Sequence, residues 1–208
     1  MTKDLTSYIK ALCKIRRLAA IRHFTLRISY LISEADLYMG GMKNPEFLIG
    51  LGSDDHRIVA NDGKSKPVVL AGVVISEEYS PVAHSDGDVV YHAVANALLL
   101  AVGERDIGYH FPDTDPDYKG MPGIEILRHS LMAVEKRGYA PSNLTVMITA
   151  LKPKIAPHVG SMKRNLSEST GMDESSIGIG ATTGEGLSAY GKGEGINVVA
   201  AVSLRRSG

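Results

Sequence analysis

Residues 89–103 read VVYHAVANALLLAVG, an apolar run that is interrupted by the imidazole of His92 and the amide of Asn96. The run is apolar on most faces of a helix and ends at Gly103, which predicts a buried helix with a glycine stop. A helix that is apolar almost all round belongs in a protein core, so the other elements are expected to pack around it.

Strand and helix patterns are interspersed on both sides of this segment. Alternating or β-branched runs predict strands or hairpin arms at 46–53, 66–75, 144–150, 176–183 and 195–206. Apolar stripes that are bounded by proline or glycine predict further helices at 123–139 and 157–171. The first strand is expected to enter a glycine-bearing turn, and residues 76–88 and 106–120 are expected to form loops. This order predicts an α+β fold, a single compact domain in which a mixed β-sheet is layered with helices.

The composition is ordinary for a soluble globular protein, with 44% hydrophobic and 22% charged residues among 208. The formal net charge is zero, which gives no electrostatic reason to expect a nucleic acid partner. No apolar run is long enough to span a bilayer, so no membrane partner is expected. Cys13 is the single cysteine, and one thiol forms neither an internal disulfide nor a cysteine-rich zinc site. Any metal must therefore be held by histidine and carboxylate side chains.

Residues 1–41 differ from the rest, because they carry seven lysine and arginine residues against three aspartate and glutamate residues. We expect residues 1–45 to be an N-terminal appendage to a domain at 46–206. The appendage is interpreted as a disordered or helical extension, as a basic targeting peptide, or as sequence upstream of a later start codon. Met39 and Met42 lie just before the first convincing strand and favour the last interpretation.

Asp54 and His56 stand two residues apart, so in an extended segment their side chains point to the same face. A carboxylate and an imidazole that converge in this way suit a divalent cation such as Zn²⁺. The third ligand stays open between His84, in a predicted loop, and His92, in the buried helix. A buried imidazole needs a partner, and for His92 that partner is either a metal or a backbone carbonyl. Three protein ligands are typical of a catalytic zinc site, which keeps a fourth position for water or substrate.

The predicted loop at 106–120 carries Asp113, Asp115 and Asp117 at two-residue spacing. This is the spacing of part of a calcium loop, but the glycine at the sixth place and the glutamate at the twelfth are missing. A calcium site is therefore not expected. The aspartates either bind a ligand or form a turn that their carboxylates cap.

Two further segments suit phosphate. ALKPKIAPH at 150–158 places Lys152 and Lys154 between a strand and a helix start, where anions bind and backbone groups can hydrogen-bond a base. GATTGEGLSAYGKGEGI at 180–196 offers hydroxyl and N–H groups for phosphate oxygens, and Glu185 as a ligand for a second cation. Solvated lysines and a plain hairpin loop are the structural alternatives, and neither segment matches a nucleotide-binding glycine motif.

Taken in order, these segments resemble the family of 2-C-methyl-D-erythritol 2,4-cyclodiphosphate synthases, and the resemblance covers about residues 47–205. The matching segments are SDDH (53–56), AHSDGDV (83–89), YHAVANALL (91–99), DIGYHFPDTDP (106–116), ALKPKIAPH (150–158), ATTGEGL (181–187) and GKGEGI (191–196). The most specific part is AHSDGDV followed by DIG-x-x-FPDTDP.

The resemblance implies a reaction of the non-mevalonate isoprenoid pathway. In it, 4-diphosphocytidyl-2-C-methyl-D-erythritol 2-phosphate becomes the 2,4-cyclodiphosphate and CMP, because the 2-phosphate attacks the β-phosphorus. The family also implies a homotrimer of small α+β subunits with active sites at the interfaces. The expected location is the bacterial cytoplasm, or a plastid if residues 1–41 are a transit peptide.

The resemblance also implies roles for single residues. Asp54, His56 and His92 would hold one Zn²⁺ per subunit, and Glu185 would bind a second divalent cation, Mg²⁺ or Mn²⁺. The implied catalytic residues are His84, Thr183 and Glu185. The implied substrate-binding residues are Asp54, His56, His84, Ser85, Asp106, Ile107, Gly108, Phe111, Pro112, Asp113, Thr114, Asp115, Ala150, Pro153, Lys154, Ile155, Ala156, Thr182, Thr183 and Lys192.

Four positions depart from the family's usual pattern. Asn96 stands where an aspartate is common, and an amide lacks the negative charge that would make a ligand histidine more basic. Ala189 and Lys192 replace the aromatic residue and the arginine of a trimer cavity that binds isoprenoid diphosphates in some members. Ser53 replaces a bulkier residue beside the metal. A zinc hydrolase and a trimeric binding protein without activity are the competing functions.

Overall fold

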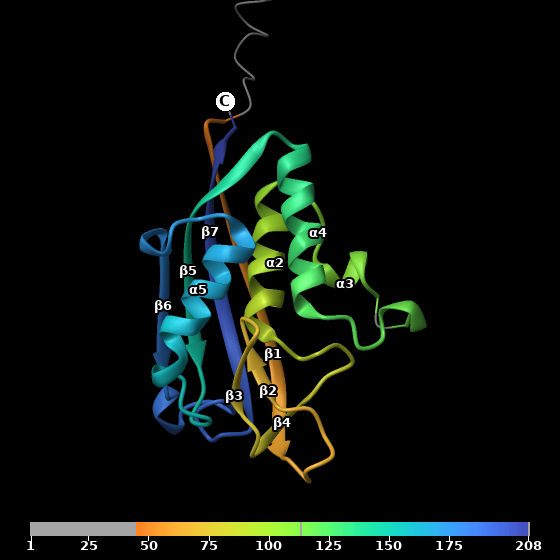
Figure 1. The fold of residues 1–208 in the computed structure, drawn as a ribbon, viewed down its shortest axis with the longest axis vertical. Coiled ribbons are helices and arrows are strands. Elements are labelled where there is room, and N and C mark those ends of the chain that lie inside the picture. Colours follow the sequence, from red (N-terminus) through yellow and green to blue (C-terminus); the bar gives the residue numbers. More distant parts are fainter. Residues whose placement is uncertain (1–44, 113, 208) are drawn as a thin grey trace, which may run out of the picture. The chain divides into compact units, whose positions relative to one another are not determined.

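The sheet at the centre of the molecule has five strands, in the order β4 (Tyr79–Val82), β1 (Phe47–Ala60), β7 (Gly195–Arg206), β5 (Tyr139–Thr149) and β6 (Ile177–Thr182) (Figure 1). Neighbouring strands are antiparallel, except that β5 and β6 are parallel. The computed structural model describes residues 45–112 and 114–207, so the predictions for residues 1–44 and for Asp113 lie outside the described residues. Among the described residues, no helix combines the length and the apolar character that crossing a membrane requires.

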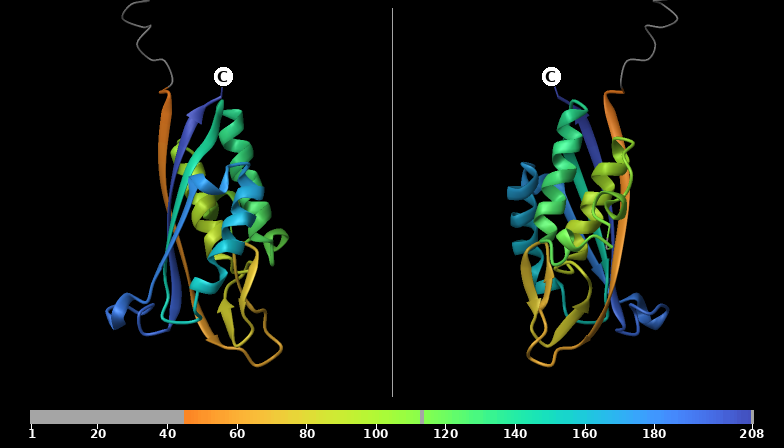
Figure 2. Two further views of the ribbon diagram at one scale, coloured as in Figure 1. Left: turned by 60° about the vertical axis from the view of Figure 1, so that its left-hand side comes forward. Right: turned by 90° about the vertical axis from the view of Figure 1, so that its right-hand side faces the viewer.

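Three helices, α2 (Val89–Ala101), α4 (Gly123–Lys136) and α5 (Val159–Thr170), lie on one face of the sheet (Figure 2). The buried side chains of α2 join those of β7 and β5 in one hydrophobic core. The other elements are short: the hairpin strands β2 (Val68–Leu70) and β3 (Val73–Ser76), helix α3 (Ile107–His110), and the 3₁₀ turns Pro116–Tyr118, Ala156–His158, Glu174–Ser176 and Gly184–Gly186. The prediction of a single compact α+β domain with a mixed sheet is confirmed for the described unit.

Strand β1 contradicts one prediction, because it passes straight through Gly50 and Gly52 instead of turning there. These glycines face helix α2. A Cβ on Gly50 would lie 1.9 Å from the carbonyl oxygen of Ala97, and one on Gly52 would lie 2.3 Å from that of Ala93. The glycines are therefore needed for close packing of α2 on the strand, and not for a change of direction.

The start of α2 is fixed by the buried carboxylate of Asp88. Its Oδ1 accepts hydrogen bonds from the backbone N–H groups of Val90 and Tyr91, which caps the helix. The same carboxylate accepts N–H bonds of 2.8 Å from Ala71 and 2.7 Å from Gly72, in the turn between β2 and β3. Asp88 thus ties the hairpin to the helix, one turn before His92.

Residues 76–88 are not entirely a loop, since Tyr79–Val82 form β4 and pair with the end of β1. Proline is tolerated in this strand at Pro81 because β4 lies at the edge of the sheet. The register places Asp55, Asn197 and Thr149 in one row across β1, β7 and β5. The segments that follow β5 and β6 therefore start at the same end of the sheet as Asp54, two or more strands away.

Candidate functional site

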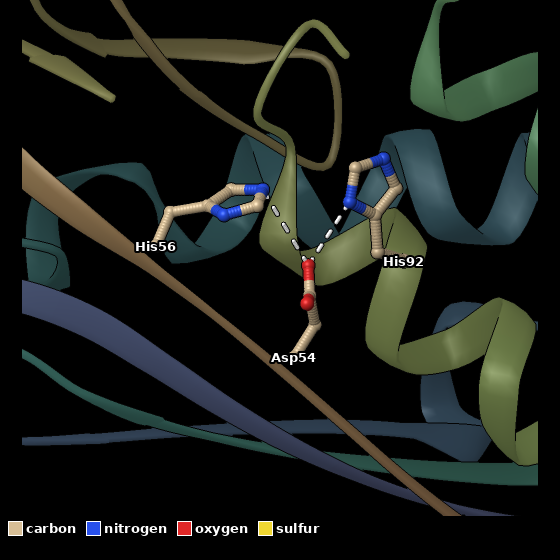
Figure 3. Close-up of side chains that lie close together, drawn as sticks. All are labelled: Asp54, His56 and His92. Carbon is tan, nitrogen blue, oxygen red and sulfur yellow. Dashed lines mark hydrogen bonds and ion pairs between the residues drawn. The ribbon is translucent and has the colours of Figure 1, made fainter. Parts of the chain in front are cut away.

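Asp54 and His56 project from the helix-facing side of β1, as the two-residue spacing predicts. They meet His92 of α2, which is 3% exposed (Figure 3). Asp54 Oδ2 lies 3.0 Å from His92 Nδ1 and 3.7 Å from His56 Nε2, and one ligand atom from each residue lies within 4.8 Å of the others. His84 is exposed and is not part of this group. Of the two histidines that the spacing left open, the structure brings His92 together with Asp54 and His56.

Burial lowers the pKa of both imidazoles and nearby carboxylates raise it, but the net shifts of His56 and His92 have opposite signs. Burial lowers the pKa of His56, and the charge of Asp54 offsets only part of that effect. Burial also lowers the pKa of His92, but the hydrogen bond to Asp54 and the charges of Asp54, Asp86 and Asp88 outweigh it, so that this pKa is raised. His92 therefore holds its proton more tightly than an ordinary histidine does.

The donor set fits a divalent metal. Ligand atoms around a tetrahedral Zn²⁺ lie about 2.0–2.2 Å from the ion, so they lie roughly 3.4 Å from one another. The distances of 3.0 and 3.7 Å at Asp54 bracket that value. His56 Nε2 is buried and has no hydrogen-bond partner among the described residues, a costly state that a metal would relieve.

Asp86 lies beside this group of candidate ligands, although no sequence pattern indicates a role for it. Its Oδ1 lies 3.8 Å from His92 Nε2, the ring nitrogen that faces away from Asp54. Its Oδ2 accepts a 2.6 Å hydrogen bond from the backbone N–H of Gly123 at the start of α4. At 3.8 Å no hydrogen bond joins the two groups, so Asp86 acts on this imidazole through its negative charge, which raises the pKa of His92.

Lys66 is a second residue that no motif indicated. Its ammonium group donates hydrogen bonds to the carbonyls of Ala83 and Ser85, on either side of His84. Burial lowers the pKa of Lys66, and the charge of Asp86 partly offsets this. The sequence does not indicate this contact, because Lys66 lies far along the chain from His84. Only the folded structure shows that the two are close together.

A cavity of about 590 Å³ opens beside the three candidate ligands. Most of the predicted residues of the two loops line it. The lining includes Asp54, His56, His84, Ser85, His92, Ile107, Gly108, Phe111, Thr114 and Asp115, together with Tyr118 and Lys119. Asp106 does not line this cavity; it caps α3 and accepts a 3.0 Å hydrogen bond from the N–H of Tyr109. Pro112 also lies outside the lining.

The segment 106–120 is not entirely a loop, since it contains α3 and the turn Pro116–Tyr118, and aromatic contacts hold it against α4. The ring centroid of Phe111 lies 5.0 Å from that of His129 and 5.3 Å from that of Tyr118, and both pairs are edge to face. Asp115 accepts a 3.0 Å hydrogen bond from the N–H of Asp117, which is the capped turn that the sequence offered as one alternative. Asp115 also lines the cavity, so a turn role and a ligand role are compatible.

The remaining predicted residues lie at the β5–β6 side of the sheet and do not line this cavity within the described chain. Ala150, Pro153 and Ile155 are buried. Lys154, Ala156, Thr182, Thr183, Glu185 and Lys192 are exposed. Glu185 belongs to no cluster of possible metal ligands among the described residues.

Comparison with known proteins identifies relatives of the same part of the chain. The YgbB family model matches residues 47–205. The 2-C-methyl-D-erythritol 2,4-cyclodiphosphate synthase of Syntrophotalea carbinolica is 44% identical over 159 residues, which are 76% of this chain and 94% of the relative. The synthase of Bacillus licheniformis is 42% identical over 160 residues, 77% of this chain and 99% of the relative.

Solved structures are similar as well. A structure of 2C-methyl-D-erythritol-2,4-cyclodiphosphate synthase has a TM-score of 0.68 and 36% identity, over 75% of this chain and 99% of its own. The Plasmodium falciparum IspF in its CDP complex has a TM-score of 0.69 and 30% identity, over 80% of this chain and 100% of its own. The resemblance in the motifs is thereby confirmed, and the chain belongs to the YgbB family, that of the 2-C-methyl-D-erythritol 2,4-cyclodiphosphate synthases.

Proposed function

We propose that this chain converts 4-diphosphocytidyl-2-C-methyl-D-erythritol 2-phosphate to 2-C-methyl-D-erythritol 2,4-cyclodiphosphate and CMP. The observation that carries the proposal is the group Asp54, His56 and His92 beside a cavity that the 83–85 and 107–116 segments line. Relatives that bear the synthase name and are 42–44% identical over most of their length support the same reaction.

The substrate brings two phosphate groups of like charge together, and the site must hold them in line. An oxygen of the 2-phosphate forms a bond to the β-phosphorus, and the bond from the β-phosphorus to the oxygen that bridges to CMP breaks. CMP leaves with that electron pair. Zn²⁺ held by Asp54, His56 and His92 would supply a Lewis acid that stabilises the phosphate charge.

The protein's own groups position the reactants. His84 and Ser85, next to the Lys66 ammonium, contact phosphate. Asp106, Ile107 and Gly108 bind the methylerythritol hydroxyls, and residues 111–115 close over that end. The attacking phosphate is already an anion near neutral pH, so alignment and charge stabilisation account for the catalysis without a general base.

The cytidine end of the substrate binds to residues of the β5–β6 side: Ala150, Pro153, Lys154, Ile155, Ala156 and Thr182. Thr183 orients the α-phosphate, and Glu185 binds the second cation, Mg²⁺ or Mn²⁺. The CDP complex of the Plasmodium falciparum protein supports cytidine recognition in this family. Because these residues do not line the cavity of their own chain, we propose that they act on the cavity of a neighbouring copy in a homotrimer.

The proposal is tested by turnover of the cytidyl substrate with Zn²⁺ and Mg²⁺, followed by ³¹P NMR and by CMP release. Equal amounts of CMP and cyclic diphosphate are expected. A zinc-loaded protein that releases no CMP would exclude the synthase and favour a binding protein. A linear, hydrolysed product would favour the zinc hydrolase.

The domain bounds of 46–206 and the cytoplasmic or plastid location stay predictions.

A further inference from the structure

Asn96 lies on α2, four residues after His92 and on the same side of the helix. Both ends of its amide group are used. Its Nδ2 donates a 3.1 Å hydrogen bond to the backbone carbonyl of Ser53, and its Oδ1 accepts a 2.9 Å hydrogen bond from the backbone N–H of Ile107. A single side chain thus joins two segments that are far apart in sequence.

Both segments belong to the candidate site. Ser53 directly precedes the candidate ligand Asp54 on β1, and Ile107 is the first residue of α3, between Asp106 and Gly108. The first N–H groups of a helix have no acceptor within it, and a helix of four residues is too short to fix its own position. The Asn96 oxygen is therefore a fixed point for the start of α3.

The surroundings keep Asn96 in place. A Cβ on Gly52 would lie 2.8 Å from the Cβ of Asn96, so the strand passes directly against this residue. The amide reaches backbone groups, and none of its described hydrogen bonds goes to a side chain of Asp54, His56 or His92. The hydrogen bonds of Asn96 therefore affect the position of the backbone at Ile107, and not the charge next to the candidate metal ligands.

We propose that Asn96 is a positioning residue whose acceptor oxygen sets Asp106, Ile107 and Gly108 at the correct distance from Asp54. The inference rests on the proposed function, which assigns the hydroxyls of the substrate to these three residues. Its effect falls on substrate binding, because the metal ligands and the groups next to the phosphates keep their own contacts.

The test compares Asn96→Ala with Asn96→Asp, which keeps an acceptor for Ile107 but loses the donor to Ser53. The Asn96→Ala enzyme is expected to show a KM for the cytidyl substrate at least tenfold higher, a kcat within threefold of wild type and an unchanged zinc content. The Asn96→Asp enzyme is expected to keep KM within threefold. Asn165→Ala is the matched control, since it removes an amide that donates 2.8 Å to the carbonyl of Ala71, away from the cavity.

A second readout does not depend on activity. Hydrogen exchange of the Ile107 amide is expected to become faster in Asn96→Ala, and to stay slow in Asn96→Asp and Asn165→Ala. An unchanged KM or unchanged Ile107 exchange in Asn96→Ala overturns the inference, as does a loss of zinc in the folded Asn96→Ala protein. If Asn96→Ala does not fold, Asn96→Ser takes its place, because its shorter side chain cannot span both partners. Lack of turnover in the wild-type enzyme would instead count against the proposed function, and the exchange measurement would still decide the contact.

Discussion

Substitutions of His92 and of His84 distinguish the proposed metal ligands from the proposed substrate-binding residues. His92 is buried and hydrogen-bonded to Asp54, while His84 is exposed and lines the same cavity. His92→Ala is expected to abolish zinc binding and activity together. His84→Ala is expected to retain stoichiometric zinc and to lower kcat about a hundredfold, as the loss of one charge-stabilising donor does. Metal analysis and CMP release measure both, and full zinc content in His92→Ala would refute the ligand assignment.

The pH dependence of zinc binding follows from the two imidazoles. The pKa of His92 lies above the ordinary histidine value and that of His56 lies below it, so His92 is the ligand that must lose a proton as the metal enters. Below the raised pKa of His92, zinc affinity is expected to fall about tenfold per pH unit. Chelator competition between pH 5.5 and 8.5 measures this slope. In the Asp86→Asn variant the slope should begin at lower pH, because one of the charges that raise this pKa is gone.

At the scale of elements, the distance between β1 and α2 determines how close the candidate ligands Asp54 and His92 lie to each other. Gly52→Ala would place a methyl group 2.3 Å from the carbonyl oxygen of Ala93 and push the helix that carries His92 away from the strand that carries Asp54. We expect a loss of about 3 kcal/mol in the free energy of unfolding, at the upper end of overpacking effects, with weaker zinc binding. Gly178→Ala in β6 is the control, since its new Cβ meets nothing closer than 3.9 Å. Urea unfolding and zinc titration of the two variants decide the matter, and equal behaviour would contradict this role of Gly52.

The same glycines mark the limit of what the sequence predicts. The bounds of β7 and the end of α2 near Gly103 follow from local patterns, and the structure agrees with them. Read locally, Gly50 and Gly52 suggest a turn. Their role in packing could not be predicted, because the helix that requires them is more than forty residues away.

Like the fold, the candidate site could be predicted from the sequence only in part. Spacing along β1 indicates the Asp54 and His56 pair, and motif order selects His92. Lys66 and Asp86 act through partners that only the folded chain brings near, so no spacing reveals them. The sequence singles out Asn96 for the negative charge that it lacks, whereas in the structure its amide bonds the backbone of Ser53 and of Ile107.

At the scale of the whole molecule, one face of the sheet lacks a cover. No described helix lies on it (Figure 2), and it presents Ile49, 80% exposed, and Leu51, 64% exposed, next to Met147 and Val199. Contiguous apolar surface of this kind marks an interaction site. With the proposed homotrimer, sedimentation should give three times the mass of one chain. Ile49→Asp with Leu51→Asp should give monomers that are folded but inactive, and a wild-type monomer with full activity would exclude the trimer.

The proposed sharing of active sites between copies has a quantitative consequence. If the cavity of one copy is completed by Thr183 of the next, a trimer that mixes His92→Ala and Thr183→Ala chains contains some sites in which both sides are intact. Random mixing of equal amounts makes about one quarter of the sites whole, because each site draws its two sides from two different chains in a cyclic arrangement. We therefore expect the inactive variants to recover about a quarter of wild-type activity when they are unfolded together and refolded as mixed trimers. Sites that lie within single chains would show no recovery, and a mixture of the two variants that is not exchanged provides the matched baseline.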